Sequence, residues 1–126
     1  MPARTLTTRP LSAAQLSKTS EYVERHLADP IHVNDLAAIA NMSASCFARL
    51  FKQATGKTPH AFIVRARVQR AAELIRRHGS RSLAQIALET GFADQAHLTR
   101  AFRRAFGKPP AEYCRDDGKN HSDTSF

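Results

Sequence analysis

Residues 36–59 read LAAIANMSASCFARLFKQATGKTP, and residues 86–110 repeat the same pattern as IALETGFADQAHLTRAFRRAFGKPP. The matching residues lie 50 positions apart at the start of the two copies and 51 apart from their middle onward, so the second turn carries one inserted residue. Two copies are too few for a solenoid, which needs about three repeats, so the pattern predicts two related lobes. The matching pairs are Leu36-Ala37 with Ile86-Ala87, Asn41-Met42 with Gly91-Phe92, Phe47 with Leu98, Arg49 with Arg100, Phe51 with Phe102, Gly56 with Gly107, Lys57 with Lys108 and Pro59 with Pro110.

The first copy has the pattern of a short helix, a tight turn and a longer helix. The short helix is expected over residues 33–40, and Asn41 then tolerates the left-handed backbone of a turn. Ser43 is a good N-cap for a second helix that runs to about residue 54.

The second copy has the same three parts. Ser82 with Gln85 can form a capping box, Gly91 supplies the left-handed turn, and Asp94 caps a helix that ends near Phe106. A short helix joined by a tight turn to a longer one is typical of the helix-turn-helix, whose second helix enters the major groove of DNA.

The rest of the chain is also helical in its periodicity, which predicts an all-α fold. Ser12 with Gln15 can form a capping box for a supporting helix that ends at residues 29–30. A central helix is expected from 59 to about 78, and its length of about 30 Å is close to the approximately 34 Å repeat of B-DNA. Its basic residues, which could contact phosphate or simply be solvated, are Arg65, Arg67, Arg70, Arg76 and Arg77.

Composition narrows the choice of partner. The chain has 126 residues, a formal net charge of +8 and a sequence pI of about 10.3, so a polyanion such as nucleic acid is expected. No apolar run reaches the roughly 20 residues that span a bilayer, and we expect no membrane association and a cytoplasmic location. Cys46 and Cys114 lie far apart without metal-ligand spacing, so neither a disulfide, a metal site nor another cofactor is expected.

The longer helix of each copy has one apolar and one polar face. Phe47, Leu50 and Phe51, and then Leu98, Phe102 and Phe106, recur at spacings of three and four and are expected in the core. On the outward face, Arg can form two parallel hydrogen bonds with guanine, Gln can do so with adenine, and Ala leaves room for a thymine methyl group. An ordinary solvated face is the alternative, and the recurrence of Arg at equivalent positions argues against it.

The two copies resemble the DNA-binding domain of the AraC/XylS family of bacterial transcription regulators. The resemblance covers about residues 16–114 and is carried by DLAAIANMSASCFARLFKQATGKTPHAFI and SLAQIALETGFADQAHLTRAFRRAFGKPPAEY. It implies seven helices in two helix-turn-helix lobes, homeodomain-like in form, joined by a long central helix.

The resemblance also implies residue roles. Base contacts fall on Ser45, Ala48 and Arg49 in the first lobe and on Gln95, Ala96, His97 and Arg100 in the second. Contacts with the DNA backbone are expected from Ser43, Lys52, Gln53, Thr99, Arg103 and Arg104.

The sequence departs from the family pattern in three places. Ala48 and Ala96 stand where relatives often have longer polar side chains, so readout there is apolar or absent. Asn41 replaces a frequent Gly, and His32 stands where the first short helix normally has a Ser or Thr cap, although Asp35 can assist that helix through its dipole.

The expected organisation is a flexible leader at 1–11, a DNA-binding domain at 12–115 and a disordered tail at 116–126. Within the domain, lobe one covers about 12–58, the linker helix about 59–78 and lobe two about 80–115. Many relatives carry an additional N-terminal domain for which this chain has no room, so we expect no small-molecule effector site and either a single-domain regulator or the C-terminal half of a longer one.

These features favour a sequence-specific regulator of transcription, with activation the usual direction in this family. One polypeptide with two reading heads needs no dimer and suits a non-palindromic site of double-stranded DNA. A non-specific nucleic-acid-binding module remains the main alternative, because the basic charge alone would suffice for it. An enzyme is disfavoured, since no His lies beside a plausible nucleophile, and RNA polymerase is a further partner that some relatives touch.

Overall fold

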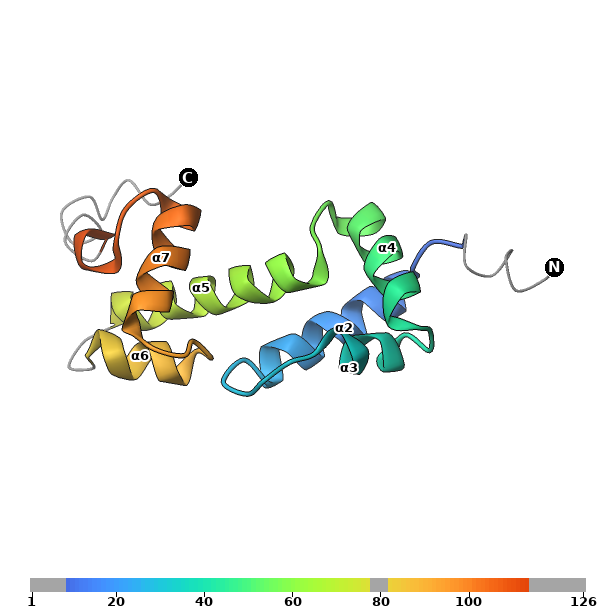
Figure 1. Ribbon diagram of the computed structural model, residues 1–126, viewed down its shortest axis with the longest axis horizontal. Coiled ribbons are helices and arrows are strands. Elements are labelled where there is room, and N and C mark those ends of the chain that lie inside the picture. Colours follow the sequence, from blue (N-terminus) through green and yellow to red (C-terminus); the bar gives the residue numbers. More distant parts are fainter. Residues whose placement is uncertain (1–8, 78–81, 114–126) are drawn as a thin grey trace. The chain divides into compact units, whose positions relative to one another are not determined.

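The computed structural model describes residues 9–77 and 82–113, and these contain helices and loops but no strand, which confirms the all-α prediction (Figure 1). Residues 110–113 are helical as well. The predicted tail at 116–126 lies outside the described residues, as does the leader up to residue 8. The helices with defined bounds are α2 (Ala13–Arg25), α3 (Val33–Ile39), α4 (Ala44–Thr55), α5 (Pro59–Arg77), α6 (Leu83–Glu89) and α7 (Gln95–Phe106).

The chain divides within α5 into two compact units, Met1–Val64 and Arg65–Phe126. In the first unit α3 packs against α2 and α4, and in the second unit α6 packs against α7. Each unit therefore holds one of the two sequence copies, and each is described by itself.

Helix α2 begins as predicted but ends early. Ser12 Oγ accepts the N–H of Gln15 at 3.0 Å, and Gln15 Oε1 accepts the N–H of Ser12 at 2.9 Å, which completes the capping box. The predicted end at residues 29–30 is wrong, because α2 stops at Arg25. The ring Nδ1 of His26 contacts the carbonyl oxygen of Tyr22 at 2.9 Å and occupies an acceptor of the last turn.

The turn between α3 and α4 is closed by two backbone hydrogen bonds around a left-handed residue. Asn41 has φ 65°, its N–H donates to the carbonyl of Ala38 at 3.0 Å, and the N–H of Met42 donates to Ala37 at 3.0 Å. This pair of bonds is the Schellman motif, which satisfies carbonyl groups that a helix end leaves without partners.

The turn between α6 and α7 has the same geometry. Gly91 has φ 92°, its N–H donates to Leu88 at 3.2 Å, and the N–H of Phe92 donates to Ala87 at 2.9 Å. The cap of α7 is Asp94, three residues after the left-handed residue, whereas the cap of α4 follows Asn41 by two. The inserted residue therefore lies between the turn and the second helix.

The other predicted caps also hold in the described residues. Ser43 Oγ accepts the N–H of Cys46 at 3.2 Å at the start of α4, and Ser82 Oγ accepts the N–H of Gln85 at 3.1 Å, which is the N-cap half of the predicted box. At the start of α3, Asp35 Oδ2 accepts the N–H of His32 at 3.1 Å, so this carboxylate assists the helix that lacks a Ser or Thr cap.

An aromatic and aliphatic core fills each unit. In the first unit Phe47 and Phe51 are fully buried with ring centroids 5.3 Å apart, and Phe62 meets Phe51 edge-on at 5.2 Å. Leu11, placed by the sequence at the end of the leader, is buried as well. The principal buried residues are Val23, Leu36, Leu50 and Ile63 in the first unit and Val68, Leu74, Ile75, Ile86, Leu98 and Phe102 in the second.

Phe106 departs from its predicted core position. It is 36% exposed, because it lies in the last turn of α7, although its ring stays 4.7 Å from that of Phe102 and 5.1 Å from that of Tyr113. It covers one side of the core instead of filling it.

The turn at Asn41 can be tested by two substitutions. Asn41→Ala should lower the free energy of unfolding by about 1 kcal/mol, because a left-handed backbone crowds an ordinary Cβ, whereas Asn41→Gly should leave it nearly unchanged. Chemical denaturation followed by circular dichroism measures both. Equal losses for the two variants would mean that the Asn side chain, and not its backbone conformation, holds the turn.

Candidate nucleic-acid interface

Helix α4 turns one face into the core and a polar face outward. Phe47, Leu50 and Phe51 are buried on the inner side, because apolar residues three and four positions apart share a helix face. The predicted contact residues lie on the other side: Ser43, Ser45, Arg49, Lys52 and Gln53 are exposed and Ala48 is half-buried.

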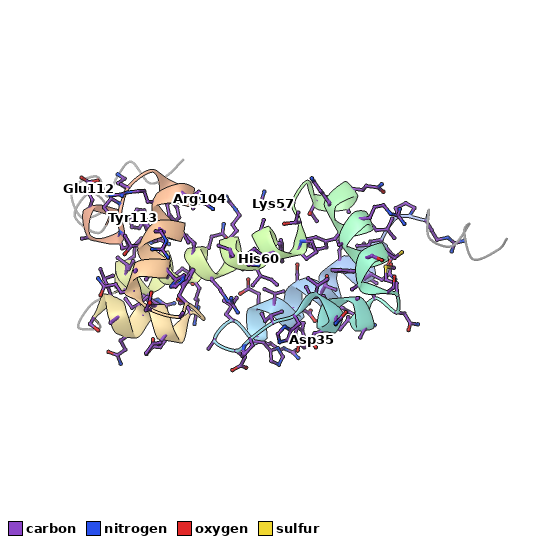
Figure 2. All side chains as sticks on the ribbon, viewed as in Figure 1. Asp35, Lys57, His60, Arg104, Glu112 and Tyr113 are labelled. Atoms are coloured by element: carbon purple, nitrogen blue, oxygen red, sulfur yellow. The ribbon has the colours of Figure 1, made fainter. Side chains whose placement is uncertain are left out.

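Helix α7 repeats this arrangement in the second unit. Leu98 and Phe102 are fully buried, and Arg104 projects from the helix among its outward side chains (Figure 2). The predicted contact residues again gather on the outer side: Gln95, Ala96, His97, Arg100, Arg103 and Arg104 are exposed and Thr99 is half-buried.

Both outward faces are basic. Helix α4 carries Arg49 and Lys52, helix α7 carries Arg100, Arg103 and Arg104, and neither helix contains Asp or Glu. Between its caps, each helix therefore has a face with cations and no carboxylate, which attracts phosphate, and the Asp94 cap of α7 is the nearby acidic group.

The start of α7 holds a carboxylate in close contact with a histidine. Asp94 Oδ1 accepts the backbone N–H of His97 at 2.9 Å and also lies 2.8 Å from His97 Nδ1. These hydrogen bonds, the backbone bond first, hold the pKa of Asp94 below its usual value of 3.8, and the charges of His97 and Arg100 act in the same direction.

The sequence predicts only a capping role for Asp94 and does not predict its contact with the ring of His97. The available signal was an Asp at the N-cap followed by a His three residues later, since residues at this spacing meet on a helix. Which rotamer the His ring adopts cannot be read from that spacing.

The arginines of α5 differ in their exposure to solvent and in the groups that they contact. Arg70 forms an ion pair with Glu73 at 3.1 Å, and Arg76 donates to the hydroxyl of Tyr113 at 2.7 Å. Burial lowers the pKa of Arg67, while Arg65 and Arg77 are exposed. Two of these side chains are thus engaged within the second unit itself.

Within residues 9–77 and 82–113, no group of three or more His, Cys, Asp or Glu side chains could hold a metal ion. In the same ranges no helix combines the length and apolarity needed to cross a membrane. Cys46 is a half-buried free thiol, and Cys114 lies outside the described residues.

The two turns and the two outward basic helices define a helix-turn-helix protein. A family model described as a helix-turn-helix domain matches residues 36–116. The chain belongs to the AraC/XylS family of helix-turn-helix proteins and corresponds to the DNA-binding domain of those regulators.

Known proteins support the assignment. The chain is 38% identical over 92 residues to the probable transcriptional regulator LumQ of Photobacterium leiognathi, which covers 73% of this chain and 37% of LumQ. The crystal structure of a transcriptional regulator with an AraC-type DNA-binding domain from Chromobacterium violaceum is similar with a TM-score of 0.78 at 27% identity, covering 85% of this chain and 95% of that one.

A third relative was solved with nucleic acid. The DNA-binding domain of AdpA, a global transcriptional factor, in complex with a target DNA has a TM-score of 0.77 at 29% identity, covering 86% of this chain and 97% of that one. The chain thus spans nearly the whole of these solved domains but little more than a third of the length of LumQ.

The lowered pKa of Asp94 predicts a difference in acid sensitivity. A carboxyl group with a lower pKa in the folded state stabilises the fold above its unfolded pKa, and this contribution is lost as the pH falls through the folded-state value. Thermal unfolding should therefore give a higher Tm for the wild type than for Asp94→Asn at neutral pH, and the gap should close below about pH 4. A gap that persists unchanged to about pH 2 would show that the carboxylate charge is not its cause.

Proposed function

We propose that this chain is a sequence-specific regulator of transcription that binds double-stranded DNA through two helix-turn-helix lobes. The observation that carries the proposal is the recurrence, in both lobes, of an outward basic face on the helix that follows the left-handed turn. In this motif the second helix is the one that enters the major groove. The domain responsible covers about residues 12–115.

Base reading is assigned to residues on the outer face of α4 and α7, near the centre and start of each helix. Arg49 and Arg100 have the planar fork that bonds guanine O6 and N7, and Gln95 has the amide that bonds adenine. Ala48 and Ala96 leave room for a thymine methyl group. The remaining base contacts are assigned to Ser45 and His97.

Contacts with phosphate and sugar position the two helices on the duplex. Lys52, Arg103 and Arg104 supply charge for this, while hydroxyl and amide groups supply hydrogen bonds. The residues assigned to the DNA backbone are Ser43, Lys52, Gln53, Thr99, Arg103 and Arg104.

The proposal has consequences for the protein as a whole. One chain carries both recognition helices, so a monomer suffices for a bipartite, non-palindromic DNA site. The protein is expected to act in the cytoplasm. Activation is the expected direction of regulation from the AraC/XylS membership, with RNA polymerase as a second partner. The protein acts by binding, and no enzymatic step is assigned to it.

A non-specific nucleic-acid-binding module is the competing function, because the net charge of +8 supports it. Selection of binders from randomised DNA duplexes near physiological salt separates the two. We expect two short enriched blocks about one helical turn apart, since the two recognition helices would read successive major-groove segments. Enrichment of a single block would contradict reading by both lobes, and tight, salt-sensitive binding without enrichment would overturn sequence specificity.

Within the first lobe, Arg49 and Lys52 should respond differently to truncation. Arg49→Ala should cost about 1 to 3 kcal/mol on the selected duplex and relax the preference at one base pair. Lys52→Ala, on the same helix, is the matched control and should weaken all duplexes about equally while lowering the salt dependence. Binding titrations on selected and scrambled duplexes measure both, and an equal loss for Arg49→Ala on every duplex would remove its base-reading role.

A further inference from the structure

The Asp94 carboxylate does more than cap a helix. Its Oδ1 receives two hydrogen bonds from one residue, the backbone N–H of His97 at 2.9 Å and the ring at Nδ1 at 2.8 Å. The two side chains are 59% and 54% exposed, so the pair lies at the surface of the helix start and not in the core. The imidazole is thereby held on the outer side of α7.

Capping alone does not need a carboxylate in this protein. Ser12, Ser43 and Ser82 cap three other helices, and each Oγ accepts a backbone N–H at 3.0 to 3.2 Å. At the equivalent site of the first lobe the cap is Ser43 and the third helical residue is Cys46. The second lobe therefore differs by a carboxylate and an imidazole placed together.

The contact decides which ring nitrogen carries the proton. An ionised carboxylate can only accept hydrogen bonds, so a neutral His97 must place its hydrogen on Nδ1 to bond Asp94. Nε2, on the other side of the ring, then has a lone pair and acts as an acceptor. Arg100, whose charge acts on Asp94, favours the ionised carboxylate further.

We propose that Asp94 is a positioning residue that fixes His97 as an Nδ1–H imidazole, so that Nε2 reads an amino group in the major groove. The groups of this kind are N6 of adenine and N4 of cytosine, whereas guanine and the thymine O4 offer acceptors there. The proposal rests on the proposed function, since α7 must lie in the groove for Nε2 to reach a base. In this proposal Asp94 acts on the base preference through the ring of His97.

The tautomer can be tested on the protein without DNA. Two-bond ¹H–¹⁵N correlation spectra, recorded on the alkaline side of the histidine titration, distinguish Nδ1–H from Nε2–H imidazole. We expect Nδ1–H for His97 in the wild type and in Asp94→Asn, whose amide oxygen can accept the same two hydrogen bonds. Asp94→Ser, which copies the cap of the first lobe, should lose the preference of His97 for the Nδ1–H form. An Nε2–H imidazole in the wild type would overturn the proposal.

The base preference is tested by duplex selection at the same pH. His97→Ala and Asp94→Ser should each lower the discrimination for adenine or cytosine at one shared base pair by roughly 2- to 10-fold, the worth of one hydrogen bond. Asp94→Asn should keep the discrimination of the wild type. In the His97→Ala background, Asp94→Ser should not lower the discrimination further. Circular dichroism checks that every variant is folded.

Two outcomes separate the possible failures. If Asp94→Ser weakens binding to all duplexes equally, with or without His97, the carboxylate is only a cap and the positioning role is overturned. If the wild type enriches no sequence at all, the proposed function fails and the base-reading role of His97 fails with it. The spectra of the free protein still decide the tautomer in that case.

Discussion

The left-handed residue that ends the short helix of each lobe is the constraint on which the rest of the structure depends. At Asn41 and at Gly91 the backbone is left-handed, and two backbone hydrogen bonds close the preceding helix. Because a left-handed backbone is costly for most L-residues, only Gly and Asn adopt it readily. The turn sets the direction in which the second helix leaves the first.

Packing then fixes the rotation of each second helix about its axis. Phe47 and Phe51 in α4, and Leu98 and Phe102 in α7, are fully buried, so each helix is held in one rotational setting. Close-packed interiors tolerate few alternative settings of bulky side chains. A burial pattern on the inner face therefore positions the polar groups on the outer face, and the core and the candidate DNA interface are two sides of the same helices.

The two lobes share this scaffold but differ in chemistry at the start of the second helix. The first lobe has a hydroxyl cap at Ser43, and the second has the carboxylate of Asp94 in contact with an imidazole. Both lobes thus keep the hydrogen bond that starts the second helix. In the second lobe the residue that supplies it, Asp94, also contacts the ring of His97. In the proposed function, this difference is what lets the two lobes prefer different base pairs.

The sequence by itself determined the class of fold, the repeat, the turns at Asn41 and Gly91, the caps at Ser43 and Asp94 and the outward placement of the candidate contact residues. These features depend on residue types that favour one local geometry and on the period at which apolar residues recur, and both can be read from the sequence. Only the tertiary structure decided that α2 stops at Arg25, that Phe106 remains partly exposed and that His97 turns its ring to Asp94. These outcomes depend on competition between alternative hydrogen bonds, on rotamers and on contacts outside the helix itself, such as Phe106 with Tyr113. The order of residues along one chain does not rank those alternatives.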